Sequence, residues 1–290
     1  MIRVFRLQEA ARWLGAEPLT MDADFSGVST DTRTLAKGDL FVALRGDQFD
    51  GHRFLAKAGD AGAVAAIVDT ADASVDLPQL VVPDTLKALG QLGLHHRLES
   101  SARFIGVTGS SGKTTVKEML AAILGNVGPT LATRGNLNNH IGVPLTLLEL
   151  SAEHQYAVIE MGASGLGEIA YTVALAKPDV ALITNAGDAH LEGFGSYDNI
   201  VRAKGEIIDG VPDTGTVVLN ADDPAFERWR QRAGGRRIVS VSALGKEADV
   251  RCLAIRPLAA GYDIDVEGPD GWQGTLQLAL SGEHNVGNAL

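Results

Sequence analysis

The chain has almost no cysteine, since Cys252 is the only one among its 290 residues. A single thiol excludes an internal disulfide, and such a composition is typical of a reducing compartment. We therefore expect a cytoplasmic protein. A small buried apolar residue is a simpler interpretation of Cys252 than a catalytic thiol.

Long apolar runs are also missing. No window approaches the roughly eighteen uninterrupted apolar residues that a membrane-spanning helix needs. The N-terminal stretch carries Glu9 and Arg12 where a signal peptide would be apolar, and it is predicted to be an amphipathic helix. We expect no membrane insertion. Apolar residues still make up 45% of the chain, enough for sizeable cores, and 290 residues suit two domains.

An excess of positive charge is absent as well, because the formal net charge is −11. Nucleic-acid binding needs clustered lysine and arginine, so the charge argues against a nucleic-acid partner. A protein of this charge that binds an anion must place its cations locally. Arg33, Lys113 and Lys204 are candidates, and Mg²⁺ is an alternative source of positive charge.

The most informative stretch that is present reads RFIGVTGSSGKTTVKEML, residues 103–120. Its apolar start predicts a buried strand, and the apolar spacing after Lys113 predicts a helix. A strand, a small-residue turn and a helix N-terminus together form an anion site. We expect a nucleotide on this loop, with Lys113 at its outer phosphates and the hydroxyl of Thr114 facing Mg²⁺. The residues predicted to contact it are Gly109, Ser110, Ser111, Gly112, Lys113, Thr114 and Thr115.

This loop departs from the full P-loop pattern, which has a glycine where this chain has Val107. The nearest glycine is Gly109, so the loop is expected to be a tighter variant. The simpler alternative, a glycine and serine turn between any strand and helix, is disfavoured by the Gly-Lys-Thr sequence at 112–114.

The predicted fold class is α/β: a small N-terminal α/β domain, then a P-loop central domain with a mostly parallel sheet flanked by helices. Beyond Ala102, near-continuous apolar strands alternate with helices, as in a parallel sheet covered on both faces. After Leu244 shorter alternating runs indicate antiparallel strands. We place the domains at 1–83 and 84–290, with the helix after Pro83 leading into the second domain.

Polar residues follow several of these strands, at the edge where ligands bind in such sheets. Glu160 ends one strand and is predicted to hold Mg²⁺, although a solvent-facing glutamate is the alternative. His190 is predicted to be a metal ligand or phosphate contact, and Asp188 is a weaker candidate. By its spacing, Lys204 is an ordinary solvated helix lysine.

An amide cluster in TRGNLNNHIGVP comprises Asn136, Asn138 and Asn139. Amides suit a polar ligand such as a sugar or a peptide, but asparagine-rich loops also form local turns. The sequence does not decide between the two interpretations.

With these residues in view, the sequence resembles the Mur ligase family. The likeness rests on TGSSGKTT at 108–115, which shares the missing glycine, and on TRGNLNNHIGVPLTLLEL, VIEMGASGLGEIA, PDVALITNAGDAHLEGFGS, LNADDP and GEHNVGNAL. Within the family, these stretches are most similar to the members that join D-Ala-D-Ala to UDP-N-acetylmuramoyl-tripeptide. The resemblance implies an ATP-dependent ligase of peptidoglycan synthesis that acts through an acyl phosphate.

The resemblance also implies roles for single residues. Thr114 and Glu160 would hold a first Mg²⁺ and His190 a second, and Lys204 matches a lysine that the family carbamylates. Lys113, Lys204 and His190 would thus be the catalytic residues. His284 and Asn285 match positions that contact adenine. The first domain resembles a site for the UDP part of the substrate, to which the Asn136, Asn138 and Asn139 loop is also assigned; its matching residues are Thr30, Thr32, Arg33, Asp47, Gln48 and Phe49.

The family has a third domain, which presents the incoming amine, and this sequence stops before it. We therefore expect an incomplete chain that binds nucleotides, does not complete the ligation alone, and is a monomer. Two alternatives remain. One is another amino-acid ligase of the same superfamily, and the other is a non-catalytic P-loop nucleotide-binding module.

Overall fold

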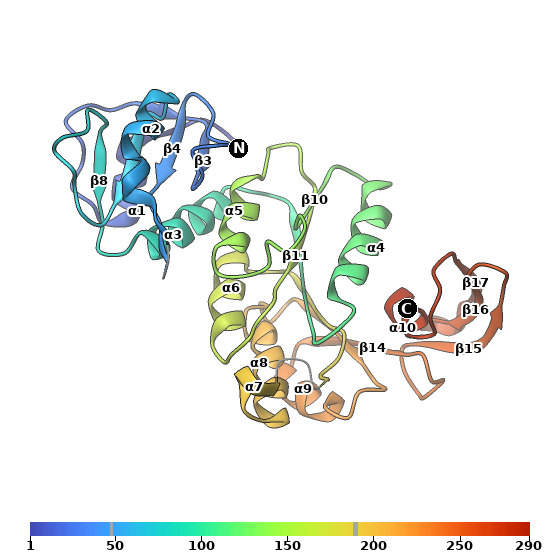
Figure 1. The fold of residues 1–290 in the computed structure, drawn as a ribbon. Helices are drawn as coiled ribbons and strands as arrows, with labels where there is room; N and C mark the ends of the chain where they lie inside the picture. The colour runs from blue at the N-terminus through green and yellow to red at the C-terminus, as the bar shows by residue number, and fades with distance from the viewer. Residues whose placement is uncertain (47–48, 188–190) are drawn as a thin grey trace. The chain divides into compact units, whose positions relative to one another are not determined.

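The computed structural model describes residues 1–46, 49–187 and 191–290. This part of the chain forms two compact units. The first comprises Met1–Ser101 and His140–His154, and the second comprises Ala102–Asn139 and Gln155–Leu290. Both are mixed α/β structures, and the larger sheet is mostly parallel and flanked by helices, as the sequence predicted (Figure 1).

A parallel sheet lies at the centre of the first unit, in the order β3-β4-β7-β8. Its strands are β3 (Gly27–Ser29), β4 (Asp39–Val42), β7 (Ala65–Val68) and β8 (Gln79–Val81). Two short antiparallel pairs accompany it, namely β1 (Phe5–Arg6) with β2 (Asp24–Phe25) and β5 (Arg45–Gly46) with β6 (Phe49–Asp50). The helices are α1 (Leu7–Leu14), α2 (Leu55–Asp60), α3 (Thr85–Leu98) and α5 (Gly142–Leu148), with a 3₁₀ turn at Gly51–Phe54.

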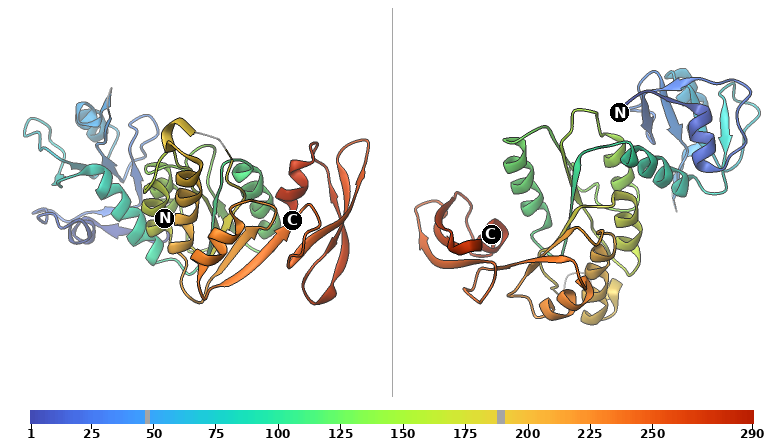
Figure 2. Two further views of the ribbon diagram at one scale, coloured as in Figure 1. Left: turned by 90° about the horizontal axis from the view of Figure 1, so that it is seen from below. Right: turned by 180° about the vertical axis from the view of Figure 1, so that it is seen from behind.

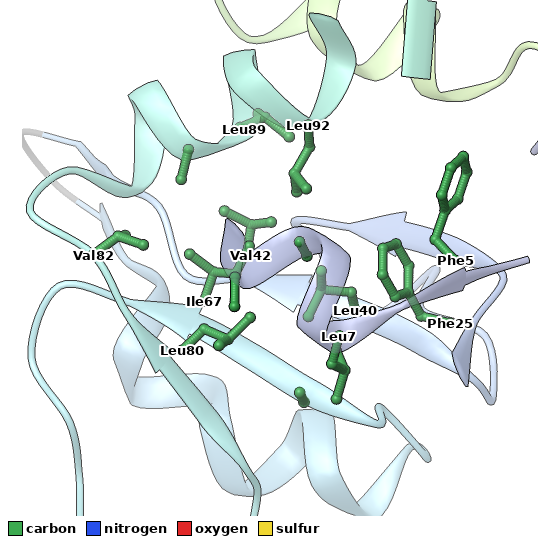
Figure 3. Packing of buried hydrophobic residues seen from close by; sticks show 14 of the residues in the cluster. Phe5, Leu7, Phe25, Leu40, Val42, Ile67, Leu80, Val82, Leu89 and Leu92 are labelled. Atoms are coloured by element: carbon green, nitrogen blue, oxygen red, sulfur yellow. The ribbon is translucent and has the colours of Figure 1, made fainter. Parts of the chain in front are cut away.

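Both faces of this sheet are buried, because alternate residues of each strand point to opposite sides. On one side Leu40, Val42 and Ile67 pack with Phe5, Phe25, Leu89 and Leu92 (Figure 3). On the other side Phe41 and Val68 pack against Leu55 and Ala58 of α2. The first unit is therefore a three-layer structure with its own core.

The compact units do not divide at Pro83, where the sequence placed the domain boundary. Asp84 caps α3 by accepting hydrogen bonds from the backbone N–H groups of Leu86 and Lys87. Leu89 and Leu92 of that helix belong to the first core. The Pro-Asp pair thus marks the start of a helix, and α3 and residues 140–154 complete the first unit rather than leading into the second.

His96 joins three segments of the first unit. Its Nε2 accepts a hydrogen bond from the backbone N–H of Ile2 (3.0 Å), so its Nδ1 carries the proton that is donated to the Leu147 carbonyl (2.8 Å). The ring is 1% exposed, and burial lowers the pKa of His96 to about 4. A neutral imidazole therefore ties the N-terminus to α3 and α5.

The second unit is built on a sheet with the order β10-β11-β9-β12-β13-β14-β15-β16-β17 in the described residues. From β10 to β15 neighbouring strands are parallel, whereas β16 and β17 are antiparallel additions, as expected after Leu244. The strands are β9 (Arg103–Thr108), β10 (Thr130–Ala132), β11 (Tyr156–Glu160), β12 (Val180–Ile183), β13 (Thr216–Asn220), β14 (Arg237–Ser242), β15 (Val250–Pro257), β16 (Tyr262–Glu267) and β17 (Gln273–Leu278).

Helices cover both faces of this sheet. They are α4 (Lys113–Gly125), α6 (Glu168–Ala176), α7 (Leu191–Phe194), α8 (Tyr197–Asp209), α9 (Phe226–Ala233) and α10 (His284–Ala289). Val107 of β9 packs on Val116 of α4, whereas a Cβ atom at Gly106 would lie 3.2 Å from Cδ1 of Ile207 in α8. The parallel strands accordingly lie between α4 on one side and α6 and α8 on the other, and α10 packs on the β15–β17 strands (Figures 1 and 2).

Three elements of this unit, β10, α7 and α9, were not expected from the sequence. None of the described helices meets the length and hydropathy that crossing a membrane requires.

Candidate active site

The loop between β9 and α4 is held by the neighbouring strand end. The backbone N–H of Ser110 donates to the Asn185 carbonyl (3.0 Å), and that of Ser111 donates to Asn185 Oδ1 (3.0 Å). The hydroxyl of Thr184 in turn donates to the Ser111 carbonyl (2.6 Å). The segment after β12 thus sets the shape of a loop that the sequence identified only by its composition.

Glycine is required at both ends of this loop. Gly109 has φ +148°, and a Cβ atom there would lie 1.9 Å from Oγ1 of Thr184. Gly112 has φ +78° and immediately precedes α4. Val107 is fully buried in β9, so the loop starts only at Gly109 and is tight, as predicted.

Thr114 and Glu160 meet beside this loop. The Thr114 hydroxyl lies 3.2 and 3.0 Å from the two carboxylate oxygens of Glu160, which is 1% exposed. Asn138 Nδ2 donates to Glu160 Oε1 (2.8 Å). Among the described residues these are the donors to the Glu160 carboxylate, and both are neutral. A buried carboxylate with a hydroxyl beside it is a set of hard oxygen ligands that suits Mg²⁺.

The described residues contain no group of three or more histidine, cysteine, aspartate or glutamate side chains that could enclose a metal.

Lys113 supplies positive charge at the mouth of the loop. It is the first residue of α4, and its Nζ lies 3.4 Å from the Ser110 carbonyl. Partial burial lowers the pKa of Lys113, and the Glu160 carboxylate partly offsets this effect. Thr115 follows in the first helical turn. An ammonium and the N-terminus of α4 thus converge on one place, as the sequence predicted for an anion.

Lys204 is not the solvated lysine that its spacing suggested. It is 2% exposed, and its Nζ lies 5.1 Å from the centre of the Phe194 ring. Burial and the charge of Lys113 lower the pKa of Lys204 to about 8, although Glu168 and Glu206 oppose the shift. A lysine in this state has a larger neutral fraction near neutral pH than an ordinary lysine.

Several predicted residues cannot be placed. His190 and Asp188 lie outside the described residues, as do Asp47 and Gln48. Ala186, which lies two residues before Asp188 in the chain, is held by Asp223. The buried carboxylate of Asp223 accepts hydrogen bonds from the backbone N–H groups of Ala186 and Ala225, each 2.7 Å long.

The three asparagines have different surroundings. Asn138 reaches Glu160, whereas the Asn136 carbonyl closes a turn by accepting from the Asn138 N–H (2.8 Å). Asn139 is the last residue before the chain enters the first unit. The turn interpretation thus holds at Asn136, whereas the binding of a polar ligand by the cluster stays a prediction.

A pocket of about 400 Å³ lies beside the ends of β12, β13 and β14. It is lined mainly by apolar side chains, with His284, Asn220 and Asp222 among the polar ones. Asn285 is not part of its lining and instead donates to the Ser281 carbonyl. Asn288 does line it and was missed, although its i, i+4 spacing from His284 on α10 could have indicated it.

The first unit has a pocket of about 480 Å³ of its own. The predicted residues Thr30, Thr32, Arg33 and Phe49 all line it, and the sequence missed its other members, Asp31, Phe41, Phe54 and Lys57. The rings of Phe49 and Phe54 stack, with centroids 5.7 Å apart. The Arg33 guanidinium binds Asp31 and lowers the pKa of that carboxyl to about 2. Three aromatic rings and two cations thus line one cavity.

Comparison with known proteins identifies the family. The Mur ligase middle domain matches residues 107–290, and a second domain of the Mur ligase family, described as catalytic, matches residues 24–97. The UDP-N-acetylmuramoyl-tripeptide–D-alanyl-D-alanine ligase of Escherichia coli (strain K12) is 46% identical over 279 residues, which make up 96% of this chain and 61% of that protein.

Two solved structures extend the likeness to three dimensions. MurF from Acinetobacter baumannii is 40% identical with a TM-score of 0.92, covering 99% of this chain and 63% of that one. MurF from Thermotoga maritima in complex with ADP is 31% identical with a TM-score of 0.82, covering 91% and 61%. The chain thus spans about three fifths of the length of these relatives. It belongs to the Mur ligase family.

Proposed function

We propose that this chain provides the ATP site and the UDP-substrate site of a ligase that joins D-Ala-D-Ala to UDP-N-acetylmuramoyl-tripeptide. The observation that carries the proposal is the pairing of Thr114 with the buried Glu160 beside the Gly109–Gly112 loop. Relatives named for this reaction, and an ADP complex among them, support it.

The chemistry begins with the meeting of two anions. The terminal carboxylate of the tripeptide attacks the γ-phosphorus of ATP, ADP leaves, and an acyl phosphate forms. The amine of D-Ala-D-Ala then attacks the acyl carbon, the nitrogen loses a proton to solvent, and the tetrahedral intermediate releases phosphate and leaves an amide. Lys113 and the N-terminus of α4 stabilise the negative charge on the phosphates throughout.

Mg²⁺, when bound, would neutralise phosphate charge and polarise the phosphorus centre. Thr114 and Glu160 are the residues that would hold it, and Asn138 would orient the Glu160 carboxylate. His190 and a modified Lys204 are proposed for a second ion. The largely apolar pocket with His284 and Asn288 suits the adenine ring, and the aromatic pocket of the first unit suits uracil with its diphosphate near Arg33 and Lys57.

The proposal is tested by calorimetric titration of the chain with ATP, GTP and UDP-N-acetylmuramoyl-tripeptide, each with Mg²⁺. We expect saturable binding of ATP and of the UDP substrate and at least about tenfold weaker binding of GTP, equivalent to roughly 1.4 kcal/mol. Phosphate release on adding D-Ala-D-Ala is not expected from this chain. A preference for GTP without binding of the UDP substrate would instead identify a nucleotide switch.

Lys204 is proposed to carry a carbamate. The neutral amine attacks the carbon of CO₂, an N–C bond forms, and one proton passes to solvent. The product is a carboxylate-like ligand in place of a cation. The burial of Lys204 favours the reaction, because it lowers the pKa of this lysine to about 8. At a given pH, more of the Lys204 amine is therefore neutral than in an ordinary lysine.

This chemistry predicts a signal that depends on one residue. With ¹³C-bicarbonate, Mg²⁺ and ATP, the ¹³C NMR spectrum should contain a carbamate resonance that grows from pH 7 to pH 9 as the amine deprotonates. It should be lost in Lys204→Arg and kept in Lys246→Arg, which changes an exposed lysine. A carbamate resonance that survives in Lys204→Arg would place the modification elsewhere.

A further inference from the structure

A second lysine of α4 is buried more deeply than the one beside the loop. Lys117 lies one helical turn after Lys113 and is 1% exposed. Its Nζ donates to the Thr133 carbonyl (2.7 Å) and lies 2.7 Å from Glu118 Oε1, whose side chain is 67% exposed. Burying an ammonium is costly unless strong acceptors meet it, so this arrangement needs a reason.

Thr133 connects Lys117 to the site. It follows β10 directly and is 1% exposed. Its carbonyl accepts from Lys117, and its hydroxyl oxygen accepts from the backbone N–H of Glu160 (3.0 Å). Thr133 therefore holds the residue at the end of β11 whose carboxylate faces Thr114.

The same residue also begins the loop that contains Asn138. Asn138 donates to the Glu160 carboxylate, so both the backbone and the side chain of Glu160 are held by the segment that starts at Thr133. Lys117 fastens that segment to α4, the helix that carries Thr114. The bond thus links α4 to the segment that holds Glu160 of β11, the residue opposite Thr114 at the cation site.

We propose that Lys117 is a positioning residue for the cation site, acting through Thr133 to set the distance between the Thr114 hydroxyl and the Glu160 carboxylate. The inference rests on the proposed function. Residues that hydrogen-bond to the ligands of a metal, as Thr133 does to Glu160, alter metal affinity by about tenfold to a hundredfold when they are removed. The nucleotide loop itself is held by Thr184 and Asn185 and does not depend on this link.

Lys117→Met removes the ammonium and keeps the length of the side chain. ATP is titrated calorimetrically without Mg²⁺, and Mg²⁺ is then titrated at fixed ATP. We expect the Mg²⁺ concentration for half-maximal enhancement of ATP binding to rise about tenfold, whereas the affinity for metal-free ATP stays within about twofold. A lysine that merely supported the fold would change both affinities or neither.

A matched pair of variants tests the next link. Thr133→Val replaces the hydroxyl by a methyl group of the same shape, and Thr133→Ser keeps the hydroxyl. The valine variant should reproduce the raised Mg²⁺ requirement, and the serine variant should resemble the parent. Faster hydrogen exchange at the Glu160 amide is expected in Thr133→Val alone. Glu118→Gln, which changes the exposed partner of Lys117, should leave both affinities unchanged.

The double variant Lys117→Met with Thr133→Val completes the test. If Lys117 acts on Glu160 through Thr133, the Mg²⁺ requirement of the double variant should be close to that of each single variant. Independent effects would instead multiply. Should Lys117→Met fail to fold, Lys117→Gln, which keeps an N–H donor, takes its place and is expected to raise the Mg²⁺ requirement less.

An unchanged Mg²⁺ requirement in the folded Lys117 variant, or identical behaviour of the two Thr133 variants, would overturn the inference while the parent still binds Mg²⁺-ATP. A parent that binds ATP without any Mg²⁺ dependence would instead refute the proposed function.

Discussion

Lys113→Met should weaken the binding of Mg²⁺-ATP about a hundredfold, which corresponds to roughly 2.7 kcal/mol. We expect this loss because the change removes a partly buried ammonium at the mouth of the loop, which we propose donates charge-assisted hydrogen bonds to phosphate. The free energy of unfolding should not fall, because burial disfavours the charged form of Lys113 in the unliganded chain and already lowers its pKa. Calorimetry and urea denaturation measure the two quantities.

The control for this change is Lys87→Met, which removes an equally long side chain that is 79% exposed in the first unit. It should leave the affinity for ATP at the parent's value. Equal affinities of Lys113→Met and the parent for Mg²⁺-ATP would show that the loop is only a bend between strand and helix. The roles proposed for Thr114, Glu160 and Lys204 would then lose their basis.

Gly109→Ala should both destabilise the chain, by about 1–3 kcal/mol, and abolish measurable binding of ATP. The new Cβ atom would lie 1.9 Å from Oγ1 of Thr184, and the backbone at φ +148° is strained for alanine. Thr184 cannot yield freely, because its hydroxyl holds the Ser111 carbonyl. Urea denaturation and ATP titration of the same preparation measure both effects.

Gly125→Ala is the matched control, since it makes the same substitution in the last turn of α4, where a Cβ atom meets nothing within 4 Å. It should be neutral or stabilise the chain by up to about 1 kcal/mol, because alanine has the higher helix propensity. A Gly109→Ala chain as stable as Gly125→Ala, with normal ATP binding, would show that the loop adjusts to a side chain.

The nucleotide loop was predictable because its signal is local. An apolar strand, two glycines and a helix that starts with Lys113 are contiguous in the chain, and β9, the loop and α4 form where they were expected. Where the full pattern has a glycine, this chain has Val107, a buried residue of β9, and the loop begins only after that strand. The position of Glu160 was predictable as well, because an apolar strand places its last residue at the edge of the sheet.

The domain boundary was not predictable from such signals. Pro83 and Asp84 mark where a helix begins, but whether Leu89 and Leu92 pack in the first or the second core depends on residues far away in the chain. Residues 140–154 join the first unit although the sequence on either side belongs to the second. Apolar periodicity shows that a face is buried and does not show which partner buries it.

The sequence by itself determined the alternation of strands and helices, the anion loop with Lys113 and Thr114, and the family resemblance, because these depend on neighbouring residues and on short motifs. Only the tertiary structure decided that Lys204 and Lys117 are buried, that Asn138 binds Glu160, and that His284 and Asn288 share a pocket with Asn220. Those contacts depend on the order of strands in the sheet, which brings together residues separated by many positions. Solvent removal then changes the chemistry of each group, as the lowered pKa of Lys204 shows.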